Sequence, residues 1–176
     1  NFDGATGYLL GKENEGLPAM FTFMNTARVG TAIQGLAASE LAYQNAVPYA
    51  LERQSMRALS GTKNPDQVAD AIIHHADVRR MLLTARAFAE GGRAMLYDAA
   101  KYADFMTQAG TEAEREQAEN QLGFLTPILK AFLTETGLES ASNAMQVYGG
   151  HGYIKEHGLE QILSLIHISE PTRPLY

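Results

Sequence analysis

The stretch TPILKAFLTETGLESASNAMQVYGGHG, residues 126–152, has the clearest structural pattern in this 176-residue chain. Its apolar residues recur at helical spacing until they reach a group of glycines, which indicates one long helix with a glycine-rich end. Thr126 suits the N-cap of that helix, and Pro127 suits its first turn. The predicted core face consists of Ile128, Ala131, Phe132, Leu138, Ala141, Met145 and Tyr148.

Two further helices are predicted upstream, over residues 18–59 and 68–108. Pro48 lies inside the first of them, where a proline costs about 3 kcal/mol, so we expect a kink there or two helices in succession. The charged stretch 110–121 is expected to be a solvated helix or a mobile connection. The expected core face of the first helix is Met20, Met24, Ala27, Val29, Ile33, Leu36 and Leu41.

Long antiparallel helices with narrow apolar stripes form a bundle. Three of them leave one side open, so a fourth helix is expected, although none is evident in the sequence. Upstream, residues 8–10 lie between two glycines and are predicted to form one short strand, whose partner strands would lie outside this chain. The predicted fold class is therefore mainly α: an incomplete antiparallel helical bundle preceded by one short β strand.

The last segment, LSLIHISEPTRPLY (163–176), differs in character from the rest. The helical period stops, and two prolines appear within four residues. The segment is similar to the translated read-through of a sequencing adapter, and we expect it to be non-native. The alternative is an ordinary disordered tail.

The composition excludes several classes of protein. The net charge of −6 gives no broad attraction to phosphate backbones or anionic lipid, so neither nucleic acid nor a membrane surface is expected as a partner. No apolar run reaches the roughly 18 residues of a transmembrane helix. The absence of cysteine removes thiol catalysis and fits a cytoplasmic protein. The histidines show no metal-ligand spacing, so no metal site is predicted.

The glycine group at 149–152 suggests a ligand. Bare backbone at a helix end permits the close approach of an anion such as a pyrophosphate, and Gln146 lies where its amide can bond a base or ribose. A helix C-cap followed by a loose turn is the alternative.

Two arginines are candidate ligand-binding residues. Arg28 follows Asn25 by three positions, so the two share one face of the first helix, which suits a phosphate or an acidic partner. Arg53 is predicted at the end of the same helix. For each there is a structural alternative: Arg28 as a surface residue whose stem packs on the core, and Arg53 as a cation that complements the helix dipole.

Together these segments resemble the acyl-CoA dehydrogenase family. The matching motifs, in family-like order and spacing, are GYLLGKENEGL (7–17), MNTAR (24–28), YALERQSMR (49–57) and QVYGGHGYIKE (146–156). Residues 23–37 and 64–94 look closer to the branch of 3-methylmercaptopropionyl-CoA dehydrogenase-like enzymes. The resemblance covers about residues 4–162.

The resemblance implies three segments in this chain. Residues 1–16 would be the end of a middle β domain, residues 17–162 most of a C-terminal four-helix bundle, and residues 163–176 the non-native tail. It also implies a homodimer or homotetramer, because the family binds FAD across a subunit interface.

The resemblance further assigns roles to residues. Asn25 and Arg28 would contact the acyl-CoA substrate. Arg53 and Met56 would reach the FAD of the neighbouring subunit. The segment of Gln146, Val147, Tyr148, Gly149 and Gly150 would lie against the FAD adenosine and pyrophosphate.

The reaction implied is α,β-dehydrogenation of an acyl-CoA thioester, with electron-transfer flavoprotein as the expected electron acceptor. The family's catalytic base lies either in a Tyr-Glu-Gly-Thr segment expected after Ile162, or at the position of Ala27, which cannot accept a proton. No catalytic residue is therefore predicted in the chain itself, and the chain alone is expected to be inactive. Two alternatives stay open: a non-catalytic bundle for oligomerisation or partner binding, and the DNA-damage-associated branch of the family, against which the negative charge argues.

Overall fold

The computed structural model describes residues 2–169, apart from the side chains of Thr22, Asn25 and residues 166–169. Within these residues the chain forms the α-helices α1 (Gly16–Glu52), α2 (Ala76–Gln108), α3 (Glu112–Tyr148) and α4 (Leu159–Ser169). Three short 3-10 helices connect them, namely η1 (Ile72–His74), η2 (Gly149–Tyr153) and η3 (Lys155–His157).

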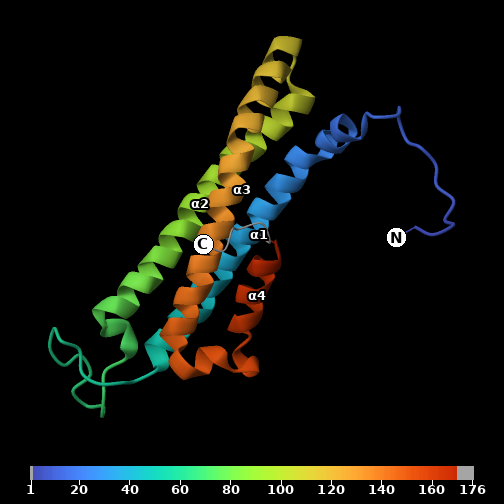
Figure 1. The fold of residues 1–176 in the computed structure, drawn as a ribbon. Helices are drawn as coiled ribbons and strands as arrows, with labels where there is room; N and C mark the ends of the chain where they lie inside the picture. The colour runs from blue at the N-terminus through green and yellow to red at the C-terminus, as the bar shows by residue number, and fades with distance from the viewer. Residues whose placement is uncertain (1, 170–176) are drawn as a thin grey trace.

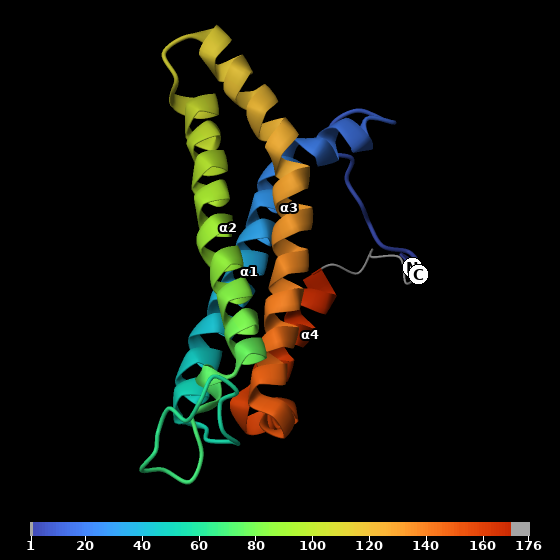
Figure 2. The same cartoon turned by 90° about the vertical axis from the view of Figure 1, so that its left-hand side faces the viewer.

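The three long helices lie side by side as an antiparallel bundle, which confirms the predicted mainly α fold (Figure 1). Helix α4 is the expected fourth helix. It packs on α3 and α1, and Leu159 at its start is buried. Turned by 90°, the bundle shows α2 and α3 diverging toward the end at which they are joined, with α1 crossing behind them (Figure 2). Among the described helices, none combines the length and the apolar character needed to span a membrane.

The predicted strand over residues 8–10 is not formed. Residues 2–15 are exposed throughout and run away from the bundle (Figure 1). A strand needs a neighbour for its backbone hydrogen bonds, and in the described residues the β pairing is limited to an isolated bridge between Gln54 and Ala71.

Helix α1 packs through small side chains. Its buried residues follow helical spacing: Ala32, Gly35, Leu36, Ala38, Ser39, Ala42, Ala46 and Ala50. The predicted core face was partly wrong, because Ile33 and Leu41 are about half exposed. Pro48 does not divide the helix, which continues to Glu52 and ends there rather than near residue 59. The proline is exposed, while Ala46 and Ala50 beside it hold this part of α1 in the core.

Helix α3 begins earlier than predicted. A capping box starts it: the Thr111 hydroxyl accepts from the backbone N–H of Glu114, whose carboxylate accepts from the backbone N–H of Thr111. Thr126 is therefore not an N-cap, and its hydroxyl donates to the carbonyl of Leu122 inside the helix. The charged stretch 110–121 forms the first turns of α3, as one of the two predicted alternatives had it.

The helical pattern also continues past residue 162. Helix α4 runs to Ser169, and Leu163 packs against the core formed by α1, α2 and α3. Residues 170–176 of the predicted non-native tail lie outside the described residues. Whether residues 163–176 are native stays a prediction.

Candidate functional site

The glycine bend, Gly149–Gly150, closes α3 and opens a groove. Gly149 adopts φ 59° and ψ −134°, a backbone conformation that favours glycine. Gly150 is exposed, and a side-chain carbon built on it would meet no atom within 4 Å. Gly152, in contrast, is buried, and such a carbon would lie 2.5 Å from the carbonyl oxygen of Met145. Packing therefore accounts for Gly152 and backbone conformation for Gly149, whereas no intramolecular contact accounts for Gly150.

Arg53 reaches the same groove from the end of α1. Although Arg53 and Gly149 are far apart in the sequence, α1 and α3 run in the same direction, and their packing brings the two C-terminal ends together (Figure 1). This glycine groove has a volume of about 560 Å³. Its lining is Tyr49, Arg53, Ser55, Ile72, Gln146, Val147, Tyr148, Gly149, Gly150, His151 and Ile154. The structure thus brings together all the predicted cofactor residues except Met56.

A compact loop holds Arg53 in place. The carbonyl of Arg53 accepts from Ile72 N–H at 2.8 Å, and the N–H of Ser55 donates to the carbonyl of Asp70 at 3.0 Å. The buried carboxylate of Asp70 accepts from the backbone of Ala58 at 2.9 Å and from the Arg57 guanidinium at 3.2 Å. Among the described residues no carboxylate lies within ion-pair range of Arg53, so its charge is available to a ligand.

Two stacked tyrosines form one wall of the groove. The rings of Tyr49 and Tyr148 are 3.9 Å apart between centroids, with an interplanar angle of 15°. The Tyr49 hydroxyl donates to the carbonyl of Tyr148 at 3.2 Å and lies 3.1 Å from Nδ1 of His151. The Tyr148 hydroxyl donates to the carbonyl of Asn45 at 2.9 Å. Burial raises the pKa of the Tyr148 phenol, and the nearby Tyr49 and Glu52 add to that rise.

The polar groups of the bend are partly engaged. The backbone N–H of Gly149 donates to the carbonyl of Gln146, so this N–H is already engaged within the chain. The Gln146 side-chain amide donates to the Tyr153 hydroxyl at 2.9 Å, while the side chain itself is exposed. Val147 is buried and contributes an apolar part of the wall.

Met56 does not line the glycine groove, and Ser55 is its nearest neighbour in the sequence that does. Met56 has a positive φ of 58°, and its side chain is 77% exposed. Its carbonyl accepts from Asp70 N–H at 2.9 Å, which holds this residue within the compact loop. In a single copy of the chain, Met56 is therefore displayed to solvent beside the groove.

The predicted substrate residues lie on the first half of α1. Arg28 is half-buried on that helix. The side chain of Asn25 lies outside the described residues. At about 1.5 Å of rise per residue, Arg28 and Arg53 are about 37 Å apart along the helix. One copy of the chain therefore keeps the two predicted sites well separated.

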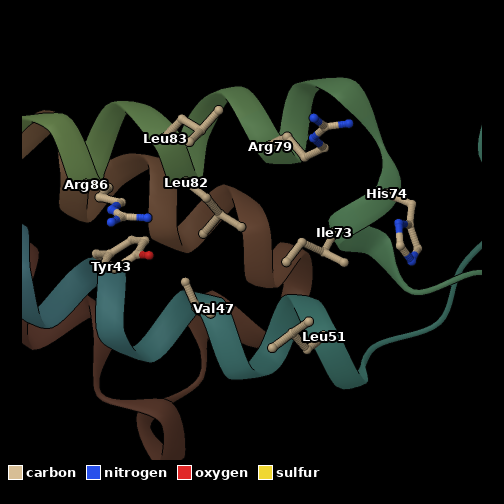
Figure 3. Close-up of a pocket in the computed structure, with 9 residues that line it drawn as sticks. All are labelled: Tyr43, Val47, Leu51, Ile73, His74, Arg79, Leu82, Leu83 and Arg86. Carbon is tan, nitrogen blue, oxygen red and sulfur yellow. The ribbon is translucent and has the colours of Figure 1, made fainter.

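A second groove lies between α1, η1 and α2 and has a volume of about 440 Å³ (Figure 3). Tyr43 and Arg86 lie at one end of this largely apolar groove and His74 at the other. Arg86 is paired with Glu90 at 2.7 Å. No residue from the predicted site lines it. The glycine groove, in contrast, combines an available cation with open backbone.

Tyr49 and His151 were not among the predicted site residues. Each lies inside a matching motif, but the two are separated by 102 positions in the sequence. Only the packing of α1 on the end of α3 brings the Tyr49 hydroxyl to the imidazole. No periodicity or spacing in the sequence could indicate that contact.

Comparisons with known proteins agree with this architecture. The family described as acyl-CoA dehydrogenase, C-terminal domain, matches residues 14–170. The 3-methylmercaptopropionyl-CoA dehydrogenase of Ruegeria pomeroyi is 44% identical over 160 residues, which cover 91% of this chain and 26% of that protein. A butyryl-CoA dehydrogenase of Syntrophomonas wolfei is 34% identical, over 88% of this chain and 26% of that protein.

A solved structure shows the same fold. The butyryl-CoA dehydrogenase of Megasphaera elsdenii superposes with a TM-score of 0.70 and 21% identity, covering 92% of this chain and 36% of that one. The chain spans about a quarter of the length of the curated relatives it matches. From the family match and this shared helical architecture, we conclude that the chain belongs to the acyl-CoA dehydrogenase family as part of its C-terminal domain.

Proposed function

We propose that this chain is the C-terminal part of an FAD-dependent acyl-CoA dehydrogenase, in which the glycine groove binds part of the flavin nucleotide of a neighbouring subunit. The family is in general FAD-dependent. The observation that carries the proposal is the convergence of Arg53 with the Gly149–Gly150 bend in one groove. Among the described residues no carboxylate pairs with the Arg53 guanidinium, and the space over Gly150 is open, so both are available to a ligand.

The residues present fit a dinucleotide. The open space over Gly150 lets the backbone approach a pyrophosphate, and the Arg53 guanidinium supplies the opposite charge. The groove's volume of about 560 Å³ falls in the range of ligand sites and suits the adenosine and pyrophosphate part of FAD rather than the whole cofactor. The stacked tyrosines provide an apolar wall.

The acyl-CoA thioester is assigned to the other half of α1. Arg28, with Asn25 one turn earlier, would bind the anionic or polar part of the substrate. The separation of about 37 Å along the helix supports a pair of composite sites, each assembled from two copies. In that arrangement Met56, exposed beside the glycine groove, faces the neighbouring subunit and would contact its flavin.

The residues of this chain bind and orient the substrate and the cofactor, and the catalytic base is assigned to sequence beyond this chain. Ala27 stands where some branches of the family place a carboxylate, so proton removal from the α-carbon is assigned to a Glu in sequence beyond this chain. When bound, FAD supplies the hydride acceptor for the β-hydrogen. The substrate of the parent enzyme is proposed to be 3-methylmercaptopropionyl-CoA or a related acyl-CoA, its electron acceptor an electron-transfer flavoprotein, and its assembly a homodimer or homotetramer.

FAD titration of the full-length parent protein tests the proposal. We expect Arg53→Ala to weaken FAD binding about tenfold or more, because a charge-assisted hydrogen bond is lost. Arg80→Ala is the matched control, since it removes an exposed arginine outside the groove and leaves the affinity unchanged. Equal affinities of wild type and Arg53→Ala for FAD would reject the glycine groove as the FAD-binding site. A parent that binds no FAD would favour the alternative of a non-catalytic helical bundle.

A further inference from the structure

The Tyr49 hydroxyl contacts the chain on both sides of the glycine bend. It bonds the carbonyl of Tyr148, immediately before the bend, and lies within hydrogen-bond distance of Nδ1 of His151, immediately after it. We infer that Tyr49 is a positioning residue that sets the affinity of the glycine groove for its ligand by fixing the bend relative to Arg53. The inference rests on the proposed function of the groove.

The two contacts determine how the protons are placed. A phenol has one proton, and Tyr49 donates it to the Tyr148 carbonyl at 3.2 Å. At 3.1 Å from Nδ1 of His151, its oxygen accepts a hydrogen bond in the tautomer that carries the hydrogen on Nδ1, and this is the tautomer we assign. The hydroxyl thus adds a link from α1 to groups before and after Gly149 and Gly150.

The Tyr148 carbonyl accepts this bond where the helix type changes. Tyr148 is the last residue of α3 and the N-cap of the 3-10 helix η2, so its carbonyl also begins the hydrogen-bond pattern of η2. The positive φ of Gly149 turns the chain at this point. Tyr49 adds a donor from a different helix and so fixes the direction in which the bend leaves α3.

Tyr49 also connects the bend to the cation. Its backbone carbonyl accepts from the N–H of Arg53 at 2.8 Å, in the last turn of α1. Its ring stacks on Tyr148, whose own hydroxyl bonds Asn45 one turn earlier on α1. A single residue is therefore bonded to the residue that supplies the charge and to both sides of the bare backbone.

The variant Tyr49→Phe isolates the role of the hydroxyl, because the stacked ring and the backbone bond to Arg53 remain. In the full-length parent protein we expect it to weaken FAD binding about tenfold. Tyr97→Phe removes the hydroxyl of an exposed tyrosine on α2 and serves as the matched control, with unchanged affinity.

A second pair of variants addresses the other end of the contact. His151→Ala removes the donor and is expected to weaken FAD binding to a similar extent. His151→Asn places an amide N–H near the position of Nδ1 and should restore most of the affinity. The double variant with Tyr49→Phe and His151→Ala should bind FAD about as well as Tyr49→Phe alone, because both changes remove one shared interaction.

The outcomes separate this inference from the proposed function. If Arg53→Ala weakens FAD binding but Tyr49→Phe and His151→Ala do not, the groove binds FAD and the positioning role is rejected. If none of the three variants changes the affinity, the proposed function of the groove fails as well. If Tyr49→Phe unfolds the protein, the His151 pair decides: rescue by asparagine but not by alanine supports the role, and equal affinities reject it.

Discussion

At the scale of single residues, the glycines of the 149–152 segment serve different purposes. Gly149 supplies a positive φ, and Gly152 lets η2 pack directly on the backbone of α3. Gly150 has neither requirement, since its φ is not positive and the space over its Cα is open. Because the fold itself does not require a glycine at position 150, we expect Gly150 to matter for a ligand.

Substitution by alanine distinguishes these roles. Gly152→Ala places a carbon 2.5 Å from the Met145 carbonyl oxygen, and we expect it to destabilise the chain by about 1–3 kcal/mol. Gly150→Ala should change the free energy of unfolding by less than about 0.5 kcal/mol, because the added methyl meets nothing. Urea denaturation followed by circular dichroism measures both values. Similar losses in the two variants would contradict this account of the segment.

Asp70 is a second residue whose environment determines its behaviour. Its buried carboxylate accepts hydrogen bonds from the backbone of Ala58, Asn64 and Lys63 and from the Arg57 guanidinium. These bonds, with that from Ala58 the largest, hold the pKa of Asp70 well below its usual value despite its burial. Since the folded-state pKa is lowered, the carboxylate stabilises the fold above its ordinary pKa of 3.8 and loses that effect as the pH falls below it.

The variant Asp70→Asn removes this titration. We expect the thermal midpoint of the wild-type chain to fall more steeply than that of the variant between about pH 5 and about pH 2. Asp66→Asn, which changes an exposed carboxylate of the same loop, should keep the wild-type slope. Scanning calorimetry across this range measures the slopes, and parallel curves for wild type and Asp70→Asn would exclude the assigned role.

At the scale of the elements, α1 and α3 touch backbone to backbone. An added carbon at Gly35 of α1 would lie 2.3 Å from the carbonyl oxygen of Leu133, and one at Gly137 of α3 would lie 2.6 Å from the carbonyl oxygen of Gly35. The alanine-rich core face of α1 permits the same close approach along the rest of the interface. This contact sets the distance between α1 and α3 in the middle of the bundle.

We expect Gly35→Ala to separate the two helices and to destabilise the chain by at least about 2 kcal/mol. Gly30→Ala on the same helix is the control, and its expected effect on the stability of the chain has the opposite sign. Its position is open and helical, so alanine should stabilise the chain by about 0.5–1 kcal/mol through its better helix propensity. Chemical denaturation of both variants gives the comparison, and a stable Gly35→Ala would show that the helices do not meet as described.

The sequence predicted the long helices but not their ends. Apolar periodicity indicated α1, α2 and α3, and the structure confirms them. The start of α3 was placed at Thr126 because Thr–Pro suits an N-cap, whereas the capping box at Thr111 and Glu114 begins the helix earlier. The end of α1 was placed too late, since hydrogen bonds between the loop backbone and Asp70 draw the chain out of the helix after Glu52.

The candidate site was partly accessible from the sequence as well. The family motifs identified Arg53 and the glycine bend, and the structure brings both into one groove. The contact of Tyr49 with His151 depends on the parallel pairing of α1 with α3, which a local pattern does not encode. Met56 was expected beside the flavin, and within one copy of the chain it lies outside the groove.

At the scale of the whole molecule, the chain spans about a quarter of the length of its curated relatives. Large apolar side chains near the start of α1 are exposed, among them Leu17, Phe21 and Phe23. Such a surface suits packing against sequence that is not in this chain or against another subunit.

We therefore expect the 176-residue chain alone to have no dehydrogenase activity. The position of Ala27 has no proton acceptor, and the proposed base lies in sequence beyond the chain. An assay of acyl-CoA-dependent reduction of ferricenium by the purified chain, with FAD added, measures this. The full-length parent is the positive control, and a rate above the enzyme-free background in the chain alone would contradict the expectation.

The length of α1 has a consequence for inheritance. If its two ends serve different active sites, a defect at Arg28 and a defect at Arg53 damage separate halves of each site. When a cell makes both defective forms, a dimer of one copy of each carries both defects in one active site. Its second active site then has no defect. Two alleles that are each inactive alone would then restore partial growth together, which is intragenic complementation.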